Sequence, residues 1–241
     1  MHGLRVRLTG AFAGYFKEVI YGGIDGIVTT FAVVAGFAGA ALSSSETTQL
    51  SFAIVLLFGL ANLFADAASM GLGNFLSVRS EKDLYQVTRA KERAGLQQDP
   101  VCEREETIRI LQEKGFAYEH ATVLADTYKH NEEYWLDFMM HHKQALPDPR
   151  GEKEIFTGLA TFFSFMTFGA IPLLPFILQD NGDASTAFLY SCIGTFTALV
   201  VLGLLKWRVV GDRLLSSLGE VVLVGGTAAV IAYFVGTFFA V

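Results

Sequence analysis

Five long apolar stretches constrain this chain more than any other feature. A helix needs about 20 largely apolar residues to cross the hydrocarbon core of a bilayer, and each stretch is of that order. Because lipid offers no hydrogen bonds to an exposed backbone, helices are the expected form. The sequence therefore predicts an all-α, polytopic membrane protein with five transmembrane helices, over residues 19–42, 50–78, 155–178, 187–205 and 221–241.

The basic residues predict the orientation of these spans. All 18 Lys and Arg lie before the first stretch, between the second and third, or between the fourth and fifth. The other two loops, 43–49 and 179–186, contain none. Since Lys and Arg are retained on the cytoplasmic side, we expect the N-terminus inside and the C-terminus outside. The first stretch carries Asp25 and is too long for a signal peptide, so we expect it to be retained as a span.

The polar segment between the second and third spans is expected to be a helical insert in the cytoplasm. Three parts follow: residues 1–78 with two spans, 79–154 as a cytoplasmic helical metal-binding domain, and 155–241 with three spans. No helix breaker lies between Gly73 and Gly95, so the second span should continue into the insert. Further breakers are Asp99-Pro100, Gly115 and the segment 147–151, which predict three or four helices.

Composition argues against several classes of function. The formal net charge of −6 gives no basic face for a nucleic acid. The two cysteines make neither a disulfide framework nor a thiolate metal site. No phosphate-binding loop of the ATPase type is present, and no nucleophile with a base partner stands out. We therefore expect a protein that is not an enzyme.

Ionisable residues inside the spans are the strongest indication of function. An aspartate at mid-bilayer costs roughly 2.5–3.5 kcal/mol, so it is usually retained for a purpose. Asn62, Asp66 and Met70 are spaced i, i+4, i+8 on one face of the second span. Asp25 lies in the first span within a run of glycines that permits close helix approach. Carboxylate, amide and thioether ligands suit a divalent cation such as Fe²⁺. The alternative is that Asp66 bonds a neighbouring helix and Asp25 reaches the interface.

The insert holds a second group of candidate ligands. Glu103 and Glu106 share one helical face, Glu92 lies on the preceding helix, and Met139-Met140 follows later. An acidic helix is more often a solvated face, and a Met pair beside aromatic residues is more often core. From spacing alone, metal binding here is the weaker interpretation.

Four stretches resemble the vacuolar iron transporter family. They are YGGIDGIVTTFAVVAGFAGA at 21–40, SMGLGNFLSVRSEKDLY at 69–85, WLDFMM at 135–140 and GAIPLLPF at 169–176. The resemblance implies a homodimeric exporter of cytosolic Fe²⁺, often also of Mn²⁺, driven by proton counterflow and without a prosthetic group. It implies a membrane pathway at the dimer interface, to which Asp25 and Met70 correspond. It also implies a cytoplasmic metal collector, to which five residues correspond: Glu92, Glu103, Glu106, Met139 and Met140.

This sequence departs from the family at four positions. The glutamate of the family's second span falls on Asn62, and Asp66, one turn further on, stands where the family has a small residue. Asp66 is therefore expected to substitute for that glutamate. Two expected cytoplasmic glutamates fall on Gly95 and Lys143, so the collector has lost ligands. His141 and His142, beside the Met pair, are candidates to compensate.

Two other functions stay open at this point. A membrane-anchored metal-binding or sensing protein would use the insert alone, but an anchor needs no buried acids. A transporter of a non-metal cation is the other. The compactness of the chain favours a bacterial inner membrane, with a vacuolar membrane as the alternative.

Overall fold

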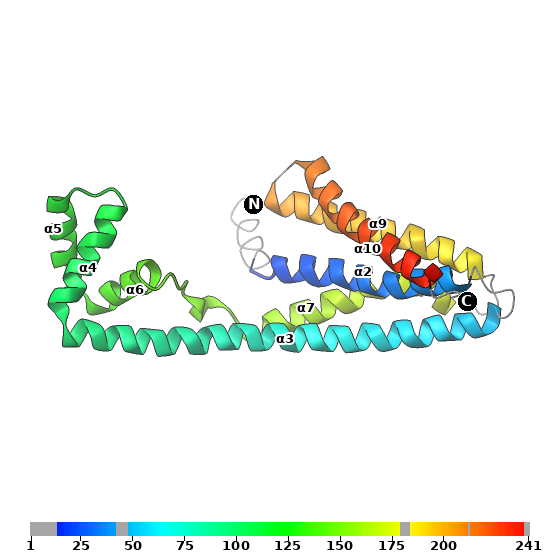
Figure 1. Cartoon of the computed structure of the whole chain (residues 1–241), viewed down its shortest axis with the longest axis horizontal. Helices are drawn as coiled ribbons and strands as arrows, with labels where there is room; N and C mark the ends of the chain where they lie inside the picture. Colours follow the sequence, from blue (N-terminus) through cyan, green and yellow to red (C-terminus); the bar gives the residue numbers. More distant parts are fainter. Residues whose placement is uncertain (1–13, 42–47, 179–183, 212, 239–241) are drawn as a thin grey trace, which may run out of the picture. The chain divides into compact units, whose positions relative to one another are not determined.

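The residues that the structure describes are almost all helical. The computed structural model describes residues 14–41, 48–178, 184–211 and 213–238. Within these ranges no strand occurs, which confirms the predicted all-α class (Figure 1). The elements are α2 (Phe16–Ala41), α3 (Thr48–Gln98), α4 (Pro100–Glu113), α5 (Tyr118–Tyr128), α6 (Glu132–His142), η1 (Pro149–Gly151), α7 (Glu154–Gly169), η2 (Ile171–Leu173), α8 (Leu174–Leu178), α9 (Ala184–Val210) and α10 (Leu214–Phe238).

Among the residues with a described structure, five helical segments are long and apolar enough to cross a membrane, as predicted. They are Phe16–Gly39, Ala53–Gln98, Glu154–Leu178, Ser185–Val209 and Leu214–Thr237. The fifth begins before the expected residue 221, and Lys206 and Arg208 lie at the end of α9 rather than in a loop. Lys and Arg can lie at the end of an apolar helix because their methylene stems pack on apolar surface while their charged groups reach water. Arg5, Arg7 and most of both uncharged loops lie outside the described residues.

Helix α3 continues well beyond its apolar part. It contains 51 residues, and at 1.5 Å per residue it is about 76 Å long, against about 30 Å for bilayer hydrocarbon. Gly95 was expected to break this helix but lies inside it. A glycine costs only about 1 kcal/mol in a helix, whereas proline removes a donor and clashes with the preceding turn. The helix accordingly ends just before Asp99 and Pro100.

The chain divides into two compact units. We call residues 1–75 with 154–241 the membrane unit, and Leu76–Lys153 the polar unit. Helix α3 contributes to both.

Glycines allow α2 to pack closely within the membrane unit. Helix α2 contacts α7, α9 and α10 (Figure 1). A Cβ at Gly22 would lie 2.8 Å from the carbonyl oxygen of Thr161, and one at Gly26 only 2.5 Å from that of Phe165. These distances are too short for any side chain. The glycines that flank Asp25 therefore let the backbones of α2 and α7 touch, as the sequence predicted.

The third span is interrupted near its end. Helix α7 stops at Gly169, and Pro172 lies in the 3-10 turn η2 before α8 begins. Proline cannot donate a backbone hydrogen bond, so some carbonyl groups nearby need other partners. The Ser191 hydroxyl on α9 donates to the Pro172 carbonyl at 2.7 Å. Helix α9 thus supplies a hydrogen bond to a carbonyl group at the interruption of the third span.

The polar unit is formed by the end of α3 with α4, α5 and α6. The Asp99 side chain caps α4 by accepting from the Cys102 amide, and Asn131 caps α6 in the same way. Gly115 follows α4 with a φ of +96°, a conformation that glycine adopts without strain. The main core cluster comprises Tyr85, Leu96, Ile110, Trp135, Leu136, Met139 and Met140.

Candidate metal sites

The candidate residues of the second span lie together on α3. Asn62, Asp66 and Met70 are all half-buried. The Asn62 amide nitrogen donates to a carboxylate oxygen of Asp66 at 2.8 Å, and Met70 packs against the core of the membrane unit. Asp66 therefore has a polar neighbour on its own helix, one turn away. This hydrogen bond within a single helix is not the contact with a neighbouring helix that the alternative interpretation required.

Asp25 brings a second carboxylate from α2. Its backbone carbonyl accepts from the Thr29 hydroxyl at 2.8 Å, and its side chain is half-buried. Asp25 and Asp66 thus place a half-buried carboxylate in each of two helices that are long and apolar enough to cross a membrane. A half-buried carboxylate in an apolar setting is stabilised by a cation or by a proton.

An apolar groove of about 590 Å³ adjoins Asn62. Its walls come from α2, α3 and α10, with Phe37, Phe58 and Val235 among them. Asn62 is the single polar side chain among the residues that line it. The groove therefore gives the Asn62–Asp66 pair an apolar setting on one side.

Two acidic residues of the polar unit converge on one lysine. The Lys143 ammonium lies 2.6 Å from Glu92 Oε1 and 2.8 Å from both carboxylate oxygens of Glu103. The Gln144 amide donates to the other Glu92 oxygen at 2.8 Å. Burial alone would lower the pKa of Lys143, but its hydrogen bonds to Glu103 and Glu92 outweigh burial, so the pKa is raised. Lys143 therefore stays charged between them.

Glu106 has a different partner. Both of its oxygens accept from the Arg109 guanidinium, at 2.9 and 2.5 Å. This contact lowers the pKa of Glu106, with smaller contributions from the charges of Arg109 and Lys143. Among the described residues, no three His, Cys, Asp or Glu side chains lie close enough together to hold a metal ion.

The Met pair lies in the core of the polar unit. Met139 and Met140 are 0% and 1% exposed, so both thioethers are packed among apolar side chains. The Thr107 hydroxyl lies 3.4 Å from the Met139 sulfur and accepts from the Trp135 indole at 2.8 Å. Their environment is therefore that of core residues, which was the alternative interpretation of the Met pair from the sequence.

The two histidines after the Met pair are exposed. Their rings lie 4.6 Å apart, and His142 also contacts Phe138. Partial burial, then the charges of His141 and Lys114, lower the pKa of His142. Both rings contact other aromatic rings on the surface of the polar unit.

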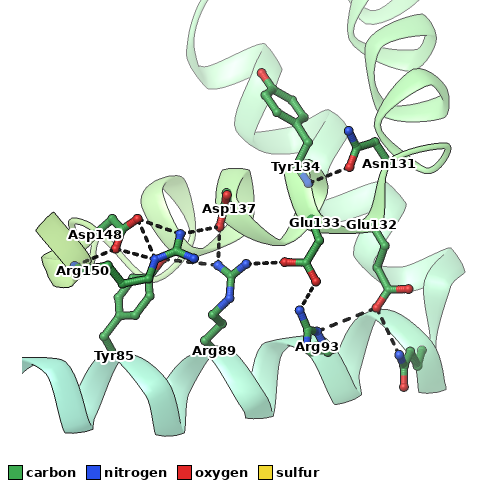
Figure 2. Close-up of polar contacts among 11 residues, drawn as sticks. Tyr85, Arg89, Arg93, Asn131, Glu132, Glu133, Tyr134, Asp137, Asp148 and Arg150 are labelled. Atoms are coloured by element: carbon green, nitrogen blue, oxygen red, sulfur yellow. Dashed lines mark hydrogen bonds and ion pairs between the residues drawn. The ribbon is translucent and has the colours of Figure 1, made fainter.

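An ion-pair network joins α6 to α3 and was not anticipated (Figure 2). Arg89 on α3 pairs with Glu133 at 2.6 Å and with Asp137. Arg150 stacks over the Tyr85 ring, 5.9 Å from its centre, and pairs with Asp148 at 2.7 Å. Burial alone would lower the pKa of Arg89, but its hydrogen bonds to Asp137 and Glu133 outweigh it and raise the pKa. The network fastens α6 to α3 near the Lys143 site.

Comparison with known proteins gives a consistent picture. A family model described as the VIT family matches residues 16–237. A vacuolar iron transporter of Toxoplasma gondii is 36% identical over 95% of this chain and 76% of its own length. Vacuolar iron transporter 1 of Oryza sativa subsp. japonica is 33% identical over 90% of this chain and 82% of its own. A vacuolar iron transporter of Plasmodium falciparum is 30% identical, over 91% and 80%.

Proposed function

Because this chain belongs to the VIT family, we propose that it transports Fe²⁺ across a membrane, out of the cytosol and in exchange for protons. Mn²⁺ is a second candidate substrate. The observation that carries the proposal is the pair of carboxylates, Asp25 on α2 and Asp66 on α3, in two helices long and apolar enough to cross a membrane.

The chemistry of these side chains suits metal–proton exchange. Carboxylate and amide oxygens bind a borderline divalent ion, and a thioether adds preference for softer metals. Asp25, Asp66, Asn62 and Met70 offer that set. A carboxylate binds either a proton or a metal ion, so protons that enter from outside compete with the bound metal and release it. One pair of residues can in this way carry both ions in turn.

We place the transported ion at the membrane residues in preference to the polar unit. There Glu92 and Glu103 already share Lys143, Glu106 is paired with Arg109, and Met139 and Met140 are enclosed. In the proposed orientation the polar unit faces the cytosol, where its surplus of acids attracts cations before they enter. The same orientation applies to a bacterial inner membrane and to a vacuolar membrane, because the basic loops face the cytosol in both.

We further propose that the protein acts as a homodimer with α3 at the interface. The face with Asn62, Asp66 and Met70 is half-buried, and Phe58 and Phe64 on the same helix are exposed. Lipid could cover the two phenylalanines, but it would offer no hydrogen bond to the half-buried carboxylate and amide. A second copy at this face would supply another such pair.

The test is Fe²⁺ uptake into proteoliposomes that contain a pH-sensitive dye. We expect Asp25→Asn and Asp66→Asn each to abolish uptake and the linked pH change. Asp83→Asn, an exposed acid on the same helix α3, is the matched control and should transport normally. If both membrane variants transported Fe²⁺ at the wild-type rate, the pathway would be wrong. Uptake without any pH change would refute the proton exchange alone.

The same vesicles separate the other functions. Tight metal binding by the whole protein without flux would favour a membrane-anchored sensor. Flux that competing Fe²⁺ and Mn²⁺ do not reduce would favour a non-metal cation.

A further inference from the structure

Lys143 supplies the cation for the most enclosed acidic pair of the polar unit. An ammonium group has three N–H donors, and three carboxylate oxygens lie 2.6–2.8 Å from its nitrogen. Two of these oxygens belong to Glu103 and one to Glu92, whose other oxygen accepts from Gln144. Every oxygen of both carboxylates therefore has a donor, and every donor of the ammonium has an acceptor.

Three helices place these groups. Glu92 lies on α3, Glu103 lies in the first turn of α4, and Lys143 is the C-cap residue of α6. The side chains of Glu92, Glu103 and Lys143 are only 5%, 15% and 26% exposed. A Cβ at Gly95 would lie 3.3 Å from Glu103 Oε1, so the absence of a side chain there leaves room for the carboxylate.

A buried carboxylate pair needs positive charge to remain ionised. A divalent ion could provide it, but it would have to enter where an ammonium is already bonded. The lysine is tied to the chain, so it is present at the site at any metal concentration. A second cation beside it would be repelled, and no further carboxylate oxygen of the pair lacks a donor.

We propose that Lys143 acts as a built-in counter-cation for Glu92 and Glu103. It joins α3, α4 and α6, it keeps a divalent ion out of this position, and it lets the polar unit fold without a bound metal. This inference goes beyond transport, because it concerns the fold of the polar unit and does not depend on whether the membrane aspartates carry iron.

Trp135 is a suitable reporter, since it is 4% exposed in the core that also holds Met139. The chain has two tryptophans, so Trp207→Phe leaves Trp135 as the sole indole. The full-length protein with this change would be unfolded by heat in detergent micelles, either with Mn²⁺ or with a chelator. Five proteins are compared: Lys143 retained, Lys143→Gln, Lys143→Glu, Glu92→Gln and the control Lys91→Gln. Lys91 is an exposed lysine next to Glu92 on α3.

With Lys143 retained, we expect Glu92→Gln to leave the difference between the midpoints in Mn²⁺ and in chelator unchanged, because any Mn²⁺ that binds is held by the membrane residues. In chelator, Lys143→Gln should lower the midpoint by roughly 5–10 °C, because it leaves two enclosed carboxylates without their cation, and Lys91→Gln should not. Lys143→Glu should lower it further in chelator and regain stability when Mn²⁺ is added, because a third carboxylate then completes a metal site.

A rise of the midpoint with Mn²⁺ in the protein that retains Lys143, abolished by Glu92→Gln, would overturn the proposal. This comparison holds even where a Lys143 variant fails to fold. Equal midpoints for Lys143→Gln and Lys91→Gln would overturn it too, as would a Lys143→Glu protein that Mn²⁺ does not stabilise.

Discussion

The close contact between α2 and α7 makes one substitution especially informative. A Cβ at Gly26 would lie 2.5 Å from the carbonyl oxygen of Phe165, 3.1 Å from its Cα and 3.2 Å from the Gly169 nitrogen. All three are backbone atoms, so no side-chain rotation can relieve the clash, and the helices must move apart. Overpacking of this kind costs about 1–3 kcal/mol. At about 2–4 °C per kcal/mol for a chain of this size, Gly26→Ala should lower the thermal midpoint by roughly 2–12 °C.

Gly73→Ala is the matched control. It makes the same change in another apolar helix, but a Cβ at Gly73 meets nothing within 4 Å. Alanine is favoured over glycine in a helix by about 1 kcal/mol, so this variant should be as stable as the wild type or more so. Both midpoints would be measured by far-ultraviolet circular dichroism in detergent micelles. A Gly26→Ala protein as stable as the wild type would refute the contact, and equal losses in both variants would show that the two positions do not differ.

Three further predictions concern the polar unit. Arg104 lowers the pKa of Asp126 to about 2 in the folded protein, below its value in the unfolded chain. The ion pair therefore adds to the free energy of unfolding above about pH 4, and this contribution is lost as the pH falls toward 2. Arg104→Gln should flatten that part of a curve of unfolding free energy against pH. Thr107→Val leaves the Trp135 indole without its acceptor; we expect a loss of about 1–3 kcal/mol in denaturant unfolding and a shifted Trp135 emission, and unchanged emission would contradict the hydrogen bond. Arg89→Met should cost about 1 kcal/mol, because its carboxylate partners are half-exposed, and this cost should disappear in high salt.

The helical class and the five spans could be predicted because each depends on properties that run along the chain. Apolar length determines which segments can cross a bilayer. The continuity of α3 followed from the absence of a proline before Pro100. The prediction that Gly95 breaks the helix was wrong, because a single glycine costs a helix only about 1 kcal/mol.

One helix boundary in the polar unit was missed. Helices α5 and α6 are separate, and Asn131 caps the second, with Glu132 and Glu133 in its first turn. This is a recognisable start signal, but the residues before it contain neither glycine nor proline. Glycine and proline therefore do not mark this boundary in the sequence.

The side-chain partners in the polar unit could not be predicted. Lys143 was recognised from the sequence as a cation among the candidate ligands, but its partners Glu92 and Glu103 are 51 and 40 residues away along the chain. Arg89 is similarly far along the chain from Glu133. Such pairs depend on how helices pack in three dimensions, and spacing within one helix carries no information about them. The Asn62–Asp66 bond is local, at i, i+4, and could have been read from the sequence.

The glycines beside Asp25 also bear on how the proposed ion pathway can evolve. Gly22 and Gly26 each touch the backbone of α7, so neither position beside Asp25 can take a carboxylate without breaking that contact. The corresponding turn of α3 is less constrained, because Asn62 and Asp66 are half-buried side chains that bond to each other. Mutation can therefore exchange an acid and an amide between these positions, and under the transport proposed above this would change the preferred ion while α2 and α7 stay packed.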